Sequence, residues 1–215
     1  TVEPGVEVRF GGDFPLIVSG QLIAKGTQDK TITFTSNKEQ PEAGDWNTIE
    51  FNGTQPSILS YCSIKYAENG ITIENSSVQI ENCEINANSQ NGINILNSIA
   101  EVRNNEIANN SQSGICITGD NHGTIQNNTI SSNTDGILLA GNSTSGVNIT
   151  ENIVMSNTQS GMQLAADDYI DVNILNNTLS ANNNGFYVSG QAKTYITNNS
   201  ISFNTIGIFY EQGED

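Results

Sequence analysis

Apolar residues occur in short clusters along the chain, and polar residues separate the members of each cluster. In residues 113–134, Ile115 and Ile117 form one cluster. Ile125 marks a second cluster and Ile130 a third. Alternation of apolar and polar residues over a few positions, bounded by Gly, Asn and Ser, is a strand signal. No window has the i, i+3, i+4, i+7 spacing of an amphipathic helix, so the pattern predicts short strands throughout.

A glycine followed by an apolar residue recurs at nearly constant spacing. The pairs are Gly70-Ile71, Gly92-Ile93, Gly114-Ile115, Gly136-Ile137, Gly161-Met162, Gly185-Phe186 and Gly207-Ile208. The steps between these glycines are 22, 22, 22, 25, 24 and 22 residues, a period typical of repeat architectures. Each unit holds three strand signals and leaves no room for a helix. We therefore expect an all-β, single-stranded parallel β-helix with three short strands per coil and about 4.8 Å between coils.

Many of the 32 asparagines fall at two fixed positions of the repeat. One is a pair before the third cluster, at Asn104-Asn105, Asn127-Asn128, Asn176-Asn177 and Asn198-Asn199. The other follows the third cluster, at Asn88, Asn110, Asn133, Asn157, Asn182 and Asn204. Residues at equal positions of successive coils stack, and stacked side-chain amides donate and accept hydrogen bonds along the column. We therefore expect asparagine ladders in the turns.

Two cysteines share a column with the second asparagine of each pair, and we place this column inside the coil. Cys62 and Cys83 would then lie in adjacent coils with Cα atoms about 5 Å apart, within disulfide range. They are either a disulfide or, as we favour, two small buried residues at the end of the ladder. Cys116 is expected to point outward, as a free or an intermolecular thiol.

Length and charge bound the possible functions. The 215 residues allow about nine coils of 22–25 residues in one domain, with irregular coils in residues 1–60 and regular repeats in 61–215. The net charge of −16 argues against nucleic acid and anionic membrane surfaces as partners. No apolar stretch is long enough to span a membrane, so we expect no membrane insertion. Few lysines with many Asn, Ser and Thr favour an extracellular or cell-surface location.

The chain resembles a known family of repeat proteins. The run GQLIAKGTQDKTITFTS at residues 20–36, followed by GDW and IEF, is similar to the opening coils of right-handed β-helix regions in bacterial and archaeal secreted and cell-surface proteins. The unit NGITIENSSVQIENCEI resembles the repeat of that family. The resemblance implies a right-handed helix. The family includes lyases, hydrolases, epimerases, adhesins and tailspikes, so it does not select an activity.

Acidic residues in the turns are the candidates for catalysis. A glycoside hydrolase needs two carboxyl groups about 5 to 9.5 Å apart. Aligned units place Asp120, with His122 as an accessory, two coils before Asp167 and Asp168, or about 9.6 Å away. Asp167, Asp168 and Asp171 could instead form a Ca²⁺ site, the one cofactor we consider. The alternative is that all these groups are solvated turn residues of an acidic protein.

A lyase is the less favoured enzyme class. The resemblance implies that lyases of this fold combine carboxylates with a basic residue. Arg103 has Glu101 and Glu106 near it in sequence, but we expect no acid on the neighbouring coils of its face.

Outward aromatic residues gather toward the C-terminal coils. Tyr187 and Phe209 occupy the outward column of the first strand, and Tyr195 and Phe203 lie outward on other strands. These side chains could stack on sugar rings or contact a partner.

The two ends suggest a further role. Each end of a β-helix is an open edge, and no capping helix is visible in the sequence. We expect either a longer protein or end-to-end self-association. The whole pattern favours a non-catalytic scaffold acting in adhesion, in an envelope, sheath or filament, or in contact with a glycan or cell-envelope component. The alternative is a carbohydrate-active enzyme that uses the turn carboxylates.

Overall fold

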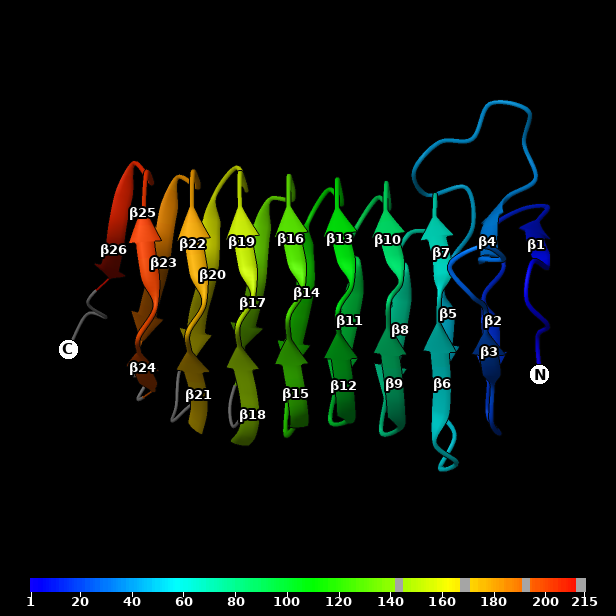
Figure 1. Ribbon diagram of the computed structural model, residues 1–215, viewed down its shortest axis with the longest axis horizontal. Helices are drawn as coiled ribbons and strands as arrows, with labels where there is room; N and C mark the ends of the chain where they lie inside the picture. The colour runs from blue at the N-terminus through cyan, green and yellow to red at the C-terminus, as the bar shows by residue number, and fades with distance from the viewer. Residues whose placement is uncertain (142–144, 167–170, 191–193, 212–215) are drawn as a thin grey trace.

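Three parallel sheets wrap around one long axis, and each passage through all three makes one coil (Figure 1). The computed structural model describes residues 1–141, 145–166, 171–190 and 194–211. We call the sheets I, II and III in the order in which the chain visits them. Sheets I and II have nine strands each and sheet III has eight. This confirms the predicted parallel β-helix with three strands per coil.

The strands of each sheet follow one another in chain order. Sheet I contains β1 (Glu7–Phe10), β4 (Ile32–Ser36), β7 (Cys62–Lys65), β10 (Glu84–Asn86), β13 (Glu106–Ala108), β16 (Thr129–Ser131), β19 (Ile153–Met155), β22 (Thr178–Ser180) and β25 (Ser200–Ser202). Sheet II contains β2 (Leu16–Val18), β5 (Ile49–Phe51), β8 (Ile71–Glu74), β11 (Ile93–Leu96), β14 (Ser113–Thr118), β17 (Asp135–Ala140), β20 (Ser160–Ala166), β23 (Asn184–Gly190) and β26 (Ile206–Glu211). Sheet III contains β3 (Ile23–Lys25), β6 (Ser57–Ser60), β9 (Ser77–Glu81), β12 (Ile99–Arg103), β15 (His122–Gln126), β18 (Ser145–Thr150), β21 (Asp171–Leu175) and β24 (Tyr195–Thr197).

Equal positions of successive repeats are aligned in the sheets. Ile93 of β11 pairs in register with Ile71 of β8 on one side and Ile115 of β14 on the other. All three isoleucines are fully buried, whereas Thr72 beside Ile71 is only half-buried. Most apolar residues of the strands therefore face inward and form one continuous core along the axis, whereas a few, such as Ile153, are exposed on the outer face.

Each corner of the coil places one residue in the left-handed region of backbone conformation. At the corner between sheets III and I, φ lies between 49° and 59° at Tyr61, Asn82, Asn104, Asn127, Glu151, Asn176 and Asn198. Asparagine adopts this conformation more readily than most residues, which explains the first asparagine of each predicted pair. The side chain of Asn104 is exposed and that of Asn105 is buried, as predicted.

Two asparagine ladders run through the corners that flank sheet I. Each Nδ2 donates to Oδ1 of the next coil at 2.8 to 3.2 Å. Asn128 is representative: its Nδ2 also donates to the carbonyl of Val102 at 2.9 Å, and its Oδ1 accepts the backbone N–H of Asn105 at 2.9 Å. The buried amides thereby satisfy one another and the bent backbone.

The recurring glycines are required for space. At Gly92, a Cβ atom would lie 2.8 Å from Cγ2 of Ile107 and 2.9 Å from Nδ2 of Asn110 in the ladder. At Gly114, it would lie 2.5 Å from Cγ2 of Ile130. Each of these contacts is too close for a real Cβ atom, so a larger residue would displace either the core or the ladder.

The cysteine column is also as predicted. Cys62 and Cys83 occupy equal positions of β7 and the coil of β10, and both are buried free thiols. The backbone N–H of Cys62 points at Sγ of Cys83 over 3.4 Å, where the ladder has an amide oxygen in later coils. The two cysteines thus stand as the small buried residues at the end of the ladder that we favoured, and the disulfide is the alternative that we did not favour.

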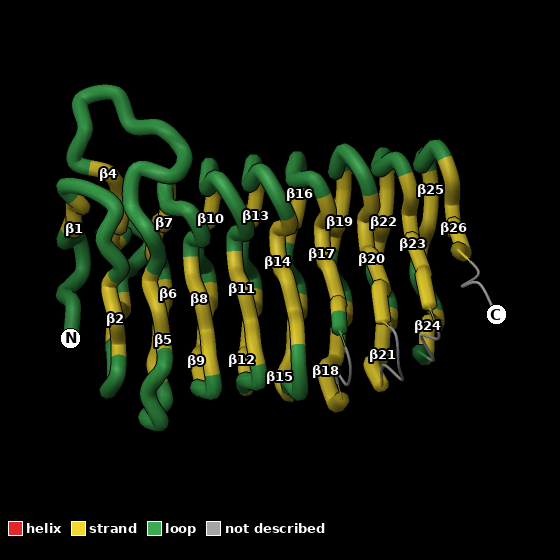
Figure 2. The backbone as a smooth tube through the Cα atoms, turned by 180° about the vertical axis from the view of Figure 1, so that it is seen from behind, coloured by secondary structure: helices red, strands yellow, loops and turns green. Residues whose placement is uncertain are grey.

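The N-terminal coils carry the one long loop among the described residues, between β4 and β5 (Figure 2). Asp45 anchors it by accepting hydrogen bonds from Ser36 Oγ at 2.7 Å and Lys38 Nζ at 2.5 Å. Burial alone would raise the pKa of Asp45, but these bonds hold it below its usual range. Trp46 then stacks on Phe10 with ring centroids 4.0 Å apart.

Candidate functional site

The outer face of sheet II becomes aromatic toward the C-terminal coils. One outward column of this sheet contains Thr72, Asn94, Cys116, Leu138, Gln163, Tyr187 and Phe209. Tyr187 of β23 and Phe209 of β26 are in register, and their rings stack with centroids 5.4 Å apart and planes at 14°. Of the four aromatic residues predicted as contacts, these two form one platform.

A pocket of about 410 Å³ lies beside Tyr187, where the coils of β20 and β23 meet. We call it the amide pocket; its lining residues are Gln159, Ser160, Gln163, Asn183, Asn184 and Tyr187. Phe209 lies one coil further along the axis and covers that side of the Tyr187 ring, while Gln163 lies one coil before it. The pocket therefore borders the side of the ring that faces Gln163.

The amide pocket presents side-chain amides that the protein does not use internally. Within the described residues, the side chains of Gln159, Gln163 and Asn183 make no hydrogen bond. Oδ1 of Asn184 is enclosed and has no partner in the described part of the chain. An enclosed acceptor without a donor costs about 1 to 3 kcal/mol, so Asn184 is left in need of a donor.

Two carboxyl groups flank the amide pocket. The Tyr187 hydroxyl donates to Glu211 on β26, and this hydrogen bond raises the pKa of Tyr187. Asp135 lies one coil before Ser160, is almost fully buried, and accepts the backbone N–H of Ser160 at 2.9 Å. Burial raises the pKa of Asp135. Cys116 stands in the outward column of the same sheet but is buried, and burial raises the pKa of its thiol to about 11.

The other two predicted aromatic contacts lie elsewhere. Tyr195 is 65% exposed on β24 of sheet III, which is a different face of the helix. Phe203 is 92% exposed at the corner between β25 and β26, one coil beyond Ala181, with φ of 57°. Phe203 thus stands at the corner that borders the amide pocket but does not line it.

The predicted acids form no described catalytic pair. Asp120 and His122 are exposed at the corner before β15, with Oδ1 and Nε2 3.8 Å apart. Asp167 and Asp168 lie outside the described residues, and Asp171 is known here only as the first residue of β21. The described residues contain no group of three or more His, Cys, Asp or Glu side chains that could hold a metal ion. The Ca²⁺ site therefore stays a prediction.

The expectation about Arg103 was wrong. Glu81 on the preceding coil is directly in register with Arg103, which forms an ion pair with Glu101 on its own strand. Glu106, the other acid near it in sequence, belongs to sheet I. Glu81 and Arg103 are 22 residues apart, which equals the repeat step between these coils, so the sequence already contained this pairing and the expectation overlooked it. Arg103 therefore has one acid on its own strand, Glu101, to which it is bound, and another on the preceding coil, Glu81.

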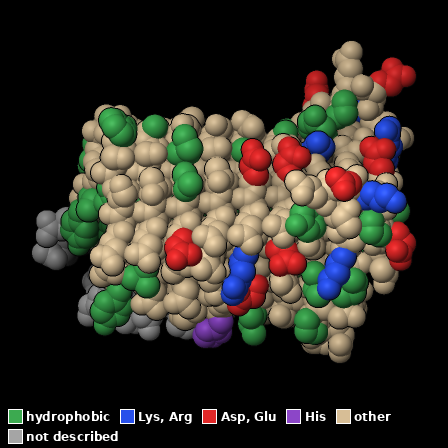
Figure 3. All heavy atoms as spheres, viewed as in Figure 1, with side chains coloured by type: hydrophobic (Ala, Val, Ile, Leu, Met, Phe, Trp, Pro, Cys, Tyr) green, Lys and Arg blue, Asp and Glu red, His purple; other side chains and the backbone are tan. Residues whose placement is uncertain are grey.

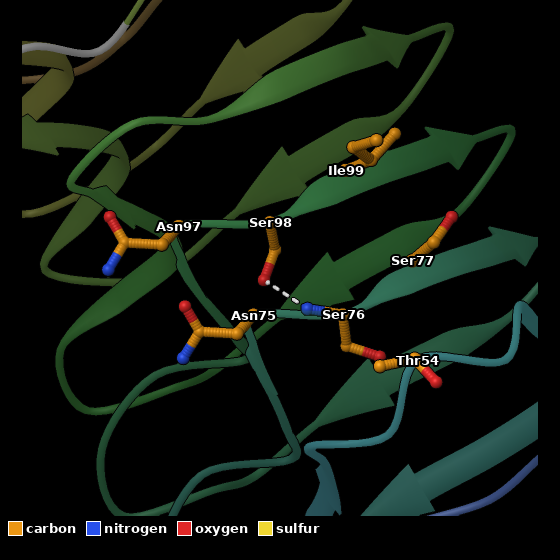
Figure 4. Close-up of a pocket in the computed structure, with 7 residues that line it drawn as sticks. All are labelled: Thr54, Asn75, Ser76, Ser77, Asn97, Ser98 and Ile99. Carbon is orange, nitrogen blue, oxygen red and sulfur yellow. Dashed lines mark hydrogen bonds between the residues drawn. The ribbon is translucent and has the colours of Figure 1, made fainter.

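A second pocket, of about 340 Å³, lies at the corner between sheets II and III (Figure 4). Its lining residues are Thr54, Asn75, Ser76, Ser77, Asn97, Ser98 and Ile99. Ser98 Oγ accepts the backbone N–H of Ser76 at 3.2 Å, and Asn97 Oδ1 accepts that of Asp120 at 2.9 Å. These polar groups hold the corner together, unlike the free amides of the amide pocket.

Charged side chains are unevenly distributed over the faces of sheets I and III. Figure 3 shows them gathered over the N-terminal and central coils, whereas the C-terminal coils are mostly uncharged in this view.

Among the described residues, no helix is long and apolar enough to cross a membrane.

Comparison with known proteins agrees with this architecture. The sequence model of the protein family described as the right-handed β-helix region matches residues 47–214. The chain belongs to this family. No curated protein matches the sequence of this β-helix. Among solved structures, it is similar to an alginate lyase from Paenibacillus sp. str. FPU-7 at 17% identity and a TM-score of 0.51, covering 98% of this chain and 92% of the lyase. It is also similar to pectate lyase Pel9A at 12% identity and a TM-score of 0.53. This second alignment covers 95% of this chain and 72% of the pectate lyase. At these identities the likeness concerns the fold.

Sequence reasoning missed most of the amide pocket of this β-helix. It placed Tyr187 in the outward column but singled out none of the other five lining residues. The available signal was the run Asn182-Asn183-Asn184, in which only the first residue occupies a ladder position.

Proposed function

We propose that this chain is an extracellular or cell-surface carbohydrate-binding β-helix that holds a glycan without cleaving it. The observation that carries this proposal is the amide pocket, in which free side-chain amides stand beside the ring of Tyr187. Aromatic rings pack on the apolar faces of sugars, and amides exchange hydrogen bonds with hydroxyl groups. The likeness to two structures titled as lyases of alginate and pectate supports a carbohydrate as the ligand.

The fold supports binding because it holds the site rigidly. Strands β20 and β23 carry four of the lining residues, Ser160, Gln163, Asn184 and Tyr187. The ladders and the core fix the register of these two strands. A preorganised site loses less conformational entropy on binding than a loop-borne site. The stack with Phe209 further limits the motion of the Tyr187 ring.

Affinity electrophoresis through gels containing different polysaccharides tests this function. We expect Tyr187→Ala to weaken the binding of any retarding polysaccharide roughly tenfold or more, because it removes the aromatic wall. Phe14→Ala is the matched control, since Phe14 is an exposed aromatic residue in the N-terminal coils. Equal retardation of the wild type and Tyr187→Ala would contradict the site, and no retardation by any polysaccharide would contradict the function.

A second candidate function is hydrolysis of a polysaccharide, favoured by the proximity of Asp120 and His122. It requires a second carboxyl group, for which Asp167 and Asp168 remain the candidates. Assays for released reducing ends separate the two functions. A binding protein releases none, whereas a hydrolase releases them and loses this activity in Asp120→Ala.

A further inference from the structure

We infer that the amide pocket selects uncharged sugars and discriminates against acidic polysaccharides such as alginate and pectate, after which the two similar lyases are named. This inference rests on the proposed carbohydrate-binding function and specifies its ligand class. It is drawn from the charges in and around the pocket.

Among the described residues, no charged side chain lines the amide pocket. Its polar groups are four carboxamides, one serine hydroxyl and one phenol. Carboxamides and hydroxyls both donate and accept, so they match sugar hydroxyl groups, which also do both. A uronic acid would instead bring a carboxylate, and proteins bind carboxylates strongly through Arg, Lys or a cation.

The strands around the pocket also lack positive charge. None of the nine strands of sheet II contains Lys, Arg or His. Two cations outside sheet II are bound to carboxylates, Arg103 of sheet III to Glu101 and Lys38 of the loop after β4 to Asp45. An acidic polysaccharide lying along sheet II would therefore find no strand residue able to neutralise it.

Carboxyl groups beside the pocket oppose a second negative charge. Glu211 is held against the Tyr187 hydroxyl, and Asp135 lies one coil before Ser160. Like charges within a few ångströms repel each other. At low ionic strength, the net charge of −16 adds to the repulsion of an acidic ligand. The binding of a neutral sugar avoids both effects.

The unpartnered acceptor points to the same ligand class. Oδ1 of Asn184 requires a hydrogen-bond donor, which a hydroxyl or acetamido group can supply. An ionised carboxylate supplies only acceptors. Replacement of a hydroxymethyl group by a carboxylate therefore removes a possible donor and adds a charge.

Isothermal titration with matched oligosaccharides tests the inference. The neutral probes are cellohexaose, mannohexaose and chitohexaose, and the acidic probes are hexagalacturonate and hexamannuronate, with and without added CaCl₂. We expect at least one neutral probe to bind at least tenfold more tightly than either acidic probe. We also expect Gln163→Lys to reduce this ratio severalfold and Gln163→Glu to increase it, with melting temperatures reporting on the folding of both variants.

The outcomes separate the inference from the function. Binding of an acidic probe as tightly as every neutral one, with loss in Tyr187→Ala, would overturn the inference and leave carbohydrate binding intact. Binding of no probe, together with no retardation by any polysaccharide, would overturn the proposed function itself.

Discussion

The same chemical group has opposite roles inside and outside the coil. In the ladders, the amide of Asn128 bonds to Asn105, Asn152 and the carbonyl of Val102. In the amide pocket, the amides of Gln163 and Asn183 have no partner among the described residues. The inner amides stabilise the bends, whereas the outer amides are available to a ligand.

This difference shows that the residue type alone does not distinguish structure from function in a β-helix. Asn182 and Asn183 are neighbours in the sequence, yet Asn182 is buried in a ladder and Asn183 is exposed at the pocket. What separates them is the direction of the side chain at the corner. The following variants compare the two environments.

The largest effect is expected from breaking a ladder. Asn128→Ala leaves the carbonyl of Val102 and the amides of Asn105 and Asn152 without their partner, which should lower the free energy of unfolding by on the order of 3 to 5 kcal/mol. Gln163→Ala is the matched control and should change the free energy of unfolding by no more than about 0.5 kcal/mol. Urea denaturation measures both. Similar losses of unfolding free energy in Asn128→Ala and Gln163→Ala would contradict the stabilising role of the ladder.

An intermediate effect is expected from filling the space that the recurring glycines leave. Gly114→Ala brings a Cβ within 2.5 Å of Ile130 and should cost about 1 to 3 kcal/mol. In Gly141→Ala, the new Cβ has no described atom within 4 Å, so it causes no crowding. The backbone φ of +83° is unfavourable for alanine and should lower the free energy of unfolding by about 1 kcal/mol. Thermal unfolding compares the two. A greater loss at Gly141 would contradict the steric explanation.

The smallest effect concerns Asp135, which lies in the outer column that also contains Asn91. Burial raises its pKa in the folded state, so its contribution to stability is fully present below the unfolded pKa and is lost as pH rises through the folded pKa. Asp135→Asn keeps an oxygen for the N–H of Ser160. We therefore expect the variant to be more stable than the wild type at pH 7 and equal to it at pH 3. A variant that is less stable at pH 7 would contradict this sign.

The coil register could be predicted from the sequence because it depends on local, repeated constraints. A glycine such as Gly92 is required by the same close contact in each coil from Gly70 to Gly185, and a ladder asparagine such as Asn110 by the same hydrogen bonds. Each constraint therefore leaves a periodic trace in the chain. The stacked pair of Tyr187 and Phe209 was also accessible, because equal positions in the repeat become neighbours in space.

The amide pocket could not be predicted in the same way because it does not repeat. Ser160 and Asn184 are in register and 24 residues apart, which is one step of the repeat, so the period places them side by side. It does not record that the side chains around them leave a pocket and that several of their amides stay free. The pairing of Glu81 with Arg103 is a different case. These residues are 22 residues apart, which is also one step of the repeat, so the period records the pairing and the expectation overlooked it.

Side-chain amide NMR of the ¹⁵N-labelled protein tests the central claim most directly, because it reports on both kinds of amide in one sample. In D₂O, the NH₂ groups of Asn105, Asn128 and Asn152 should remain protected while those of Gln163 and Asn183 exchange at once. Saturation with the tightest neutral oligosaccharide should then shift the signals of Gln163 and Asn183 and leave the ladder signals unchanged. Unshifted pocket amides at saturation, or ladder amides that exchange as fast as the pocket amides, would contradict the account.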